Sequence, residues 1–199
     1  MTFSDVNVEI FRMINDLGKH YPYLNSSAVF IAEYTVYFLA LAMIFYWFSR
    51  KNSNRMMIIC GVVTVIFAEI AGKIAGQFHF NNQPFAELPN VNQLIEKAVD
   101  NSFPSDHTII FFSLCMIFWL FKKKIGLLWI TLAVLVGISR IWVGVHYPAD
   151  VAVGAIISIV AAVIVYKIVP NLEITKKALA LYEKGESFIL PTKDKARDL

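Results

Sequence analysis

The sequence predicts an all-α integral membrane protein, in which about five transmembrane helices follow an N-terminal interfacial amphipathic helix. Three observations predict this fold: apolar residues make up 57% of the 199 residues, the mean hydropathy is +0.58, and charged residues make up only 17%. Soluble domains carry about 25% charged residues. A soluble chain of this length lacks the interior to bury so much apolar surface, so its long apolar runs indicate a lipid environment.

Residues 1–25 are predicted to form a separate interfacial segment. Apolar residues recur there at near-helical spacing, with acidic and basic residues between them. An apolar stripe opposite a charged face is typical of a helix that lies in the plane of the lipid headgroups. The apolar positions are Phe3, Val6, Val8, Ile10, Phe11, Ile14 and Leu17.

Residues 26–170 are predicted to form the membrane domain, because they contain five apolar runs. A helix needs about 20 apolar residues to cross a bilayer. The third run is short, which leaves a re-entrant segment open as an alternative. Residues 171–199 are predicted to form a cytosolic tail, partly disordered past Pro191. The five runs cover residues 28–48, 56–78, 104–121, 125–145 and 148–169.

Basic residues gather in three segments that a five-span layout places on one side of the membrane. Because positively charged loops stay in the cytosol, this side is predicted to face inward. The N-terminus, the loop of residues 78–103 and the turn at His146 then face outward. The basic residues are Arg50, Lys51, Arg55, Lys122, Lys123, Lys124, Lys167, Lys176 and Lys177.

Side chains suited to phosphoryl transfer gather at that outer boundary. His107, His146 and Asp150 can supply a nucleophile, its orienting group and a proton donor without a metal. Arg140 offers a planar fork that can bind two phosphate oxygens. Ser105 lies near the start of the third span, where free N–H groups favour an anion.

Other polar residues allow a structural interpretation. Lys73 brings positive charge to the same boundary, yet it also suits an ion pair with Glu69, four residues earlier. Cys60 and Cys115 both lie in apolar runs and provide no metal cluster. We therefore predict no metal and no cofactor. The net charge of +3 is too small to indicate a nucleic-acid partner.

Two segments resemble motifs of the type 2 phosphatidic acid phosphatase superfamily, which includes integral membrane lipid phosphatases and soluble vanadium haloperoxidases. Residues 104–107 read Pro-Ser-Asp-His and resemble its Pro-Ser-Gly-His motif. Residues 139–150 match its third motif, Ser-Arg-x5-His-x3-Asp. Within the superfamily the chain resembles the bacitracin-resistance undecaprenyl-diphosphatases.

The resemblance implies a role for each candidate residue. His146 is the implied nucleophile, Asp150 holds the other nitrogen of its ring, and His107 protonates the leaving oxygen. The implied phosphate ligands are Lys73, Ser105 and Arg140, with Gln83 as a further candidate from the family's first motif.

The first motif departs from the family pattern, which is Lys, six residues, Arg-Pro. Here Gln83 precedes Pro84, and nine residues separate it from Lys73. An amide can donate a hydrogen bond but carries no charge, so the phosphate clamp is predicted to be weaker or rebuilt. Asp106 also replaces the glycine of the Pro-Ser-Gly-His motif.

The resemblance implies an enzyme that hydrolyses undecaprenyl diphosphate through a phosphohistidine, at the outer face of a bacterial plasma membrane. Such an enzyme recycles the lipid carrier of cell-wall synthesis and opposes bacitracin. An alternative substrate is phosphatidylglycerol phosphate or phosphatidate. A transporter subunit is the alternative from another class; the clustering of charges at one boundary and the lack of repeats disfavour it. The oligomeric state stays open.

Overall fold

The computed structural model describes residues 2–189, which form helices joined by loops and turns and contain no strand. The all-α prediction is confirmed. The α-helices are α1 (Phe3–Asn15), α2 (Leu17–His20), α3 (Asn25–Val29), α4 (Thr35–Phe48), α5 (Asn52–Phe78), α6 (Pro84–Glu87), α7 (Asp106–Phe121), α8 (Lys123–Trp142), α9 (Pro148–Ile168) and α10 (Glu173–Ile189). A π-helical turn at Phe30–Tyr34 joins α3 to α4.

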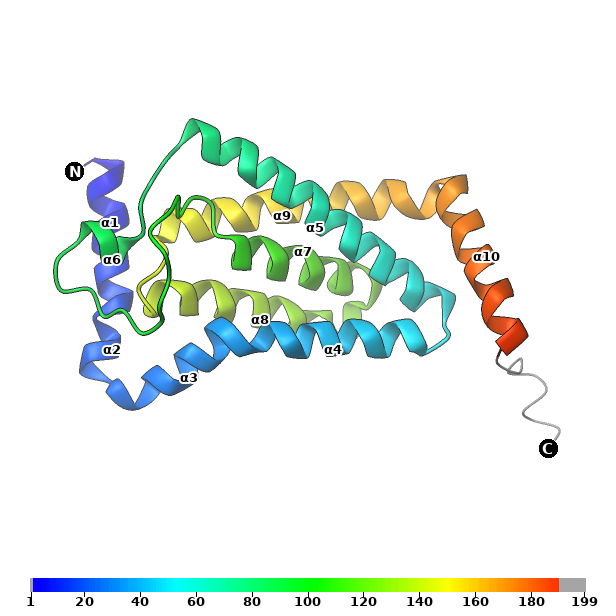
Figure 1. Ribbon diagram of the computed structural model, residues 1–199, viewed down its shortest axis with the longest axis horizontal. Helices are drawn as coiled ribbons and strands as arrows, with labels where there is room; N and C mark the ends of the chain where they lie inside the picture. Colours follow the sequence, from blue (N-terminus) through cyan, green and yellow to red (C-terminus); the bar gives the residue numbers. More distant parts are fainter. Residues whose placement is uncertain (1, 190–199) are drawn as a thin grey trace.

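Four helical segments are long and apolar enough to cross a membrane, and α7 is a shorter apolar helix. The four are Pro22–Phe48, Asn52–Phe78, Lys123–Trp142 and Pro148–Asn171. Figure 1 shows α7 running along the middle of the bundle, between α5, α8 and α9. At 1.5 Å per residue its 16 residues extend about 24 Å. The short third run is therefore a central helix of the bundle and not a re-entrant loop.

Apolar side chains of α7 fill the centre of the bundle. Phe111, Cys115, Ile117 and Phe118 are each at most 1% exposed. Small residues on the neighbouring helices allow this packing: a Cβ added at Gly72 of α5 would lie 2.6 Å from a side-chain carbon of α7. Large apolar side chains are exposed on the outer faces of the bundle, as expected for helices that contact lipid.

The basic connections lie at one end of the bundle and the long loop lies at the other. The α4–α5 and α7–α8 turns and α10 are at one end in Figure 1, and α1, α6 and the loop between α5 and α7 are at the opposite end. Arg55 at the basic end is buried and donates from Nη2 to both carboxylate oxygens of Glu186, at 2.6 and 2.7 Å. This contact attaches α10 to the bundle. The predicted disorder past Pro191 lies outside the described residues.

The N-terminal helix α1 lies across the end of the bundle that holds the long loop (Figure 1). Phe11 is buried on Tyr147, with ring centroids 5.5 Å apart. Asn15 is also buried, and its Nδ2 donates to the carbonyls of Trp142 and Asn92 at 2.8 and 3.0 Å. Helix α1 therefore braces the turn between α8 and α9 against the long loop.

Candidate active site

The turn between α8 and α9 carries His146. Gly144 adopts φ +87°, and a Cβ there would lie 2.9 Å from the carbonyl oxygen of Asn92. Glycine is favoured in this left-handed conformation because it has no Cβ. The N–H of Leu94 donates to the carbonyl of Val143 at 3.1 Å. The long loop is thus tied to the turn, and His146 is 2% exposed beneath it.

The hydrogen bonds of His146 determine which ring nitrogen can act as a nucleophile. Nδ1 lies 2.9 Å from the carbonyl oxygen of Ser102. A carbonyl only accepts, so Nδ1 carries the hydrogen and the neutral ring has its lone pair on Nε2. Burial lowers the pKa of His146, and the Asp150 carboxylate opposes this shift. Near neutral pH the neutral, nucleophilic form is therefore favoured.

Asp150 lies beside the ring and caps helix α9. Its Oδ2 accepts hydrogen bonds from Ser102 Oγ at 2.9 Å and from the Tyr147 N–H at 2.8 Å. The same oxygen is 3.6 Å from Nδ1 of His146. The direct acceptor for Nδ1 is thus the Ser102 carbonyl, and the carboxylate supplies negative charge close to the ring.

The start of α7 brings Ser105 and His107 to the same place. The N–H of Ser105 donates to the carbonyl of Asp150 at 3.2 Å, and its side chain is buried. Ser105 Oγ has no hydrogen-bond partner among the described residues. His107 is half-buried and interacts electrostatically with Arg140, His146 and Lys97. A free hydroxyl and the first N–H groups of α7 form a suitable site for an anion.

Arg140 lies in the last turn of α8 and is 3% exposed. Its Nη1 donates to the carbonyl of Ala32 at 3.1 Å, within the π-helical turn, while its Nε has no partner among the described residues. It also interacts electrostatically with Glu33 and Asp106. Nη1 of the guanidinium is thus bonded to the protein, whereas Nε is without a partner among residues 2–189 and could donate to a phosphate oxygen.

Lys73 and Gln83 have no recorded contact with His146, Asp150, Ser105 or Arg140. Lys73 is exposed on α5 and interacts electrostatically with Glu69. Gln83 is buried and contacts Asp100 through both of its amide atoms. Its Nε2 donates to Asp100 Oδ1, and its Oε1 accepts from the Asp100 N–H at 3.0 Å. The phosphate-binding roles of both residues stay predictions.

Sequence reasoning missed Lys97, which the long loop brings to the nucleophile. Its Nζ lies 3.5 Å from Nε2 of His146 and 4.0 Å from Oδ1 of Asp100. In the sequence it reads as one charge of a mixed outer loop, 49 residues before His146. No spacing rule connects the two positions. Within residues 2–189 no three His, Cys, Asp or Glu side chains are grouped to hold a metal ion.

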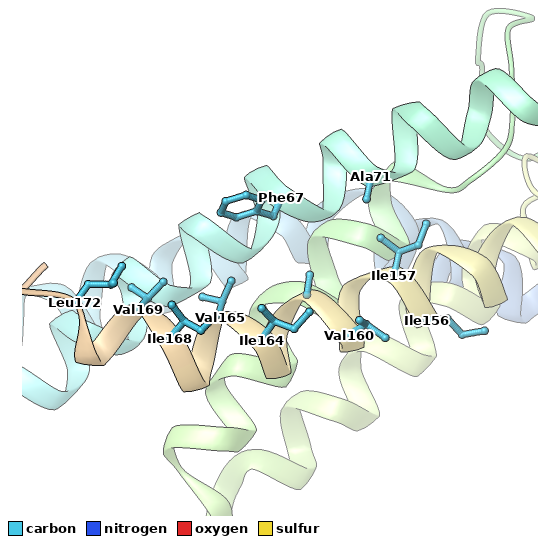
Figure 2. A pocket seen from close by; sticks show the side chains of 11 residues that line it. Phe67, Ala71, Ile156, Ile157, Val160, Ile164, Val165, Ile168, Val169 and Leu172 are labelled. Atoms are coloured by element: carbon cyan, nitrogen blue, oxygen red, sulfur yellow. The ribbon is translucent and has the colours of Figure 1, made fainter. Parts of the chain in front are cut away.

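An apolar groove of about 570 Å³ runs between α5 and α9 on the outer side of the bundle. Figure 2 shows Phe67 and Ala71 of α5 facing a row of α9 side chains across it. Ile157 and Ala71 line the groove on the turns of α9 and α5 nearest the candidate site. The groove therefore runs along the apolar parts of α5 and α9, with Ala71 and Ile157 toward the end of the bundle that holds the candidate site.

Comparisons with known proteins identify the family. A model of the PAP2 superfamily matches residues 83–174. A Bacillus licheniformis protein named "Bacitracin transport permease protein BcrC" is 54% identical over 198 residues, 100% of this chain and 98% of that protein. The chain belongs to the PAP2 superfamily. "Undecaprenyl-diphosphatase BcrC" of Bacillus subtilis is 34% identical, over 81% of this chain and 83% of its own length. The family resemblance predicted from the motifs is thereby confirmed.

Solved structures of PAP2-type and related proteins share the fold. The crystal structure of LpxE from Aquifex aeolicus aligns with a TM-score of 0.69 and 28% identity, over 84% of this chain and 99% of that one. A transmembrane PAP2 type phosphatidylglycerolphosphate phosphatase from Bacillus subtilis aligns with a TM-score of 0.62, over 85% and 87% of the two chains. At 16% identity this second likeness concerns the fold alone.

Proposed function

We propose that this chain is an undecaprenyl-diphosphatase, which hydrolyses undecaprenyl diphosphate to undecaprenyl phosphate and inorganic phosphate. The observation that carries the proposal is the buried imidazole of His146. Its Nδ1–H is bonded to the Ser102 carbonyl, so the lone pair lies on Nε2, which is next to the Lys97 ammonium. Cationic and hydroxyl groups suited to phosphate surround it. The name of the Bacillus subtilis relative supports the choice of substrate.

In the first step, the lone pair on Nε2 of His146 attacks the terminal phosphorus. The bond between this phosphorus and the bridging oxygen breaks. His107, which carries a proton when the negatively charged diphosphate is bound beside it, gives this proton to that oxygen. Undecaprenyl phosphate leaves, and the phosphoryl group remains on Nε2 as a phosphohistidine. The positive charge of the ring is balanced by Asp150, whose Oδ2 is 3.6 Å from Nδ1.

In the second step, water attacks the phosphorus of the phosphohistidine. Neutral His107 takes a proton from this water, and the nitrogen–phosphorus bond returns its electron pair to Nε2. Inorganic phosphate leaves, and both histidines recover their starting states. Throughout, Ser105 and Arg140 are placed to hold phosphoryl oxygens, where negative charge is spread in the transition state.

The groove between α5 and α9 is where we place the prenyl chain. The groove is apolar and lies between two of the helices that are long enough to cross a membrane (Figure 2). A long hydrocarbon chain can therefore stay in the bilayer while its diphosphate reaches the polar end. Burial of apolar surface contributes about 25 cal/mol per Å², so the groove can supply substrate affinity without polar contacts.

We place the active site at the extracellular face of a bacterial plasma membrane. The orientation is supported by the basic connections, which lie at the end of the bundle opposite the candidate site (Figure 1). At the outer face the enzyme recycles the carrier lipid. The word bacitracin in the name of the Bacillus licheniformis relative supports a role in resistance to this antibiotic.

The name of that relative also keeps a transport subunit as a second candidate. A transport path needs polar groups through the middle of the membrane. The middle of this bundle is filled by apolar side chains of α7, such as Phe111 and Phe118. The ionisable groups of the candidate site lie instead at one end. This distribution favours the hydrolase.

The proposal is tested by phosphate release from the purified protein in detergent, with EDTA present. Undecaprenyl diphosphate, phosphatidate and phosphatidylglycerol phosphate are compared side by side. We expect kcat/KM for undecaprenyl diphosphate to exceed the other two by at least about tenfold, equivalent to about 1.4 kcal/mol of barrier. Preference for a glycerophospholipid would contradict the proposed substrate. Absence of phosphate release from all three lipids would contradict the proposal that the protein is a phosphatase.

A further inference from the structure

Lys97 is the one positive group recorded within 3.5 Å of the attacking nitrogen in the described part of the chain. Its Nζ lies 3.5 Å from Nε2 of His146, and its side chain is 26% exposed. The other lysine predicted for this site, Lys73, is exposed on α5. The arginine of the family's first motif is replaced by Gln83, whose amide is engaged with Asp100. The long loop therefore supplies a positive charge next to His146, in addition to that of Arg140 on α8.

We propose that Lys97 is a catalytic residue that binds the transferring phosphoryl group. This inference rests on the proposed phosphatase function and extends it to a residue outside the three motifs. In the family's first motif an arginine supplies positive charge at the position of Gln83. We assign this positive charge to Lys97 in the present chain.

The geometry supports contact with the phosphoryl oxygens. The Nε2 lone pair is directed to phosphorus during attack, so it no longer attracts the Lys97 ammonium. The three equatorial oxygens then lie around Nε2 and carry the negative charge of the transition state. An ammonium 3.5 Å from the nitrogen lies next to these oxygens and has three hydrogens to donate. Such charge-assisted hydrogen bonds are about twice as strong as neutral ones.

The loop holds Lys97 in this position through Asp100. The Asp100 carboxylate is 4.0 Å from the Lys97 ammonium. Its backbone N–H and one carboxylate oxygen are both bonded to buried Gln83. An amide can donate and accept at once, whereas a guanidinium only donates. Glutamine at position 83 can therefore bind both the carboxylate and the N–H of Asp100, which an arginine cannot do. It thereby fixes the residue that holds Lys97.

The electrostatic surroundings agree with an anion site. Burial lowers the pKa of Lys97, and the Asp100 carboxylate opposes the shift. Arg140 lowers it as well, because the two cations are near each other. A bound phosphoryl dianion relieves this repulsion, so both cations gain favourable interaction when the substrate is bound.

The test compares Lys97→Met and Lys97→Arg with the wild type. Lys176→Met is the matched control, since Lys176 is exposed and paired with Glu173 on α10, at the other end of the bundle. Two quantities are measured: kcat/KM for undecaprenyl diphosphate, and the rise in Tm caused by inorganic phosphate. The second needs no turnover.

We expect Lys97→Met to lose about 100-fold or more in kcat/KM, the loss seen when one oxyanion donor is removed. Its Tm should rise less with phosphate than that of the wild type. Lys97→Arg should keep more activity than Lys97→Met, and Lys176→Met should match the wild type in both measurements.

Two results would overturn the role of Lys97. One is kcat/KM of Lys97→Met within about threefold of the wild type, less than 0.7 kcal/mol. The other is a large loss of turnover with an unchanged phosphate effect on Tm, because a ligand of phosphate must affect both. Failure of the wild type to release phosphate would instead reject the proposed function.

Discussion

The carbonyl oxygen of Ser102 accepts a hydrogen bond from Nδ1 of His146 at 2.9 Å. This contact fixes the tautomer of the ring and leaves the lone pair on Nε2. The hydroxyl of Ser102 donates to Oδ2 of Asp150 at 2.9 Å. Ser102, two residues before the Pro-Ser-Asp-His segment, thus connects the candidate nucleophile to the carboxylate that stabilises its charged form.

The first prediction concerns Asp150→Asn. An asparagine oxygen can still accept from Ser102 Oγ and the Tyr147 N–H, so the start of α9 should fold as before. The imidazolium of the phosphohistidine loses its nearby negative charge, and we expect kcat to fall about 100-fold or more. Steady-state kinetics and thermal unfolding measure the two effects. A change in Tm without a change in kcat would restrict Asp150 to capping α9.

The second prediction is an acid limb of kcat/KM below the ordinary histidine value. Burial lowers the pKa of His146, and the nucleophile must be neutral. A lowered pKa keeps the ring neutral to lower pH, so activity should persist below about pH 6.5 before it falls. The Lys97 charge contributes to the lowering, so Lys97→Met should move this limb upward.

The pH profile requires correction for ionisation of the substrate's own phosphates. After that correction, an acid limb at or above about 6.5 in the wild type would contradict a buried neutral nucleophile. His107→Gln is the reference variant for the pH profile. It removes the proton donor but leaves the hydrogen bond of His146 in place, so the acid limb that belongs to His146 should remain.

The third prediction tests the groove. Ala71→Phe adds a ring at the end of the groove nearest the site, and Ala40→Phe adds the same ring on the exposed face of α4. We expect Ala71→Phe to raise KM for undecaprenyl diphosphate about tenfold and to affect farnesyl diphosphate, whose chain is much shorter, less strongly. Equal effects of the two variants on both substrates would place the prenyl chain elsewhere.

The fourth prediction tests the orientation. Both native cysteines are buried, so a new surface cysteine can be labelled against a low background. Glu96→Cys in the long loop should react with a membrane-impermeant thiol reagent in intact cells without their wall. Lys124→Cys, at the other end of the bundle, should react only after the cells are opened. The reverse pattern would place the site in the cytosol.

Much of this arrangement could be predicted from the sequence because its determinants are local. His146 and Asp150 are four residues apart at the start of a helix, so their proximity follows from backbone geometry. The basic residues between spans likewise indicate where the chain turns. The superfamily motifs depend on the same short spacings.

The position of Lys97 beside His146 could not be predicted from the sequence, because it depends on contacts between segments that are far apart along the chain. The Gln83–Asp100 pair shapes the loop around it, and the buried amide of Asn15 ties the loop to the His146 turn. The contact between Gln83 and Asp100 could not be predicted for the same reason, because the two residues are 17 positions apart. Such contacts follow no periodicity along the chain.

The central claim is that His146 carries the phosphoryl group, and trapping of the intermediate tests it most directly. Protein mixed with undecaprenyl diphosphate labelled in the terminal phosphate is quenched in alkali, which preserves phosphohistidine, and the modified peptide is identified by mass spectrometry. We predict phosphate on His146 in the wild type and none on His146→Ala. Phosphate on another residue, or rapid turnover by His146→Ala without any labelled protein, would contradict the account.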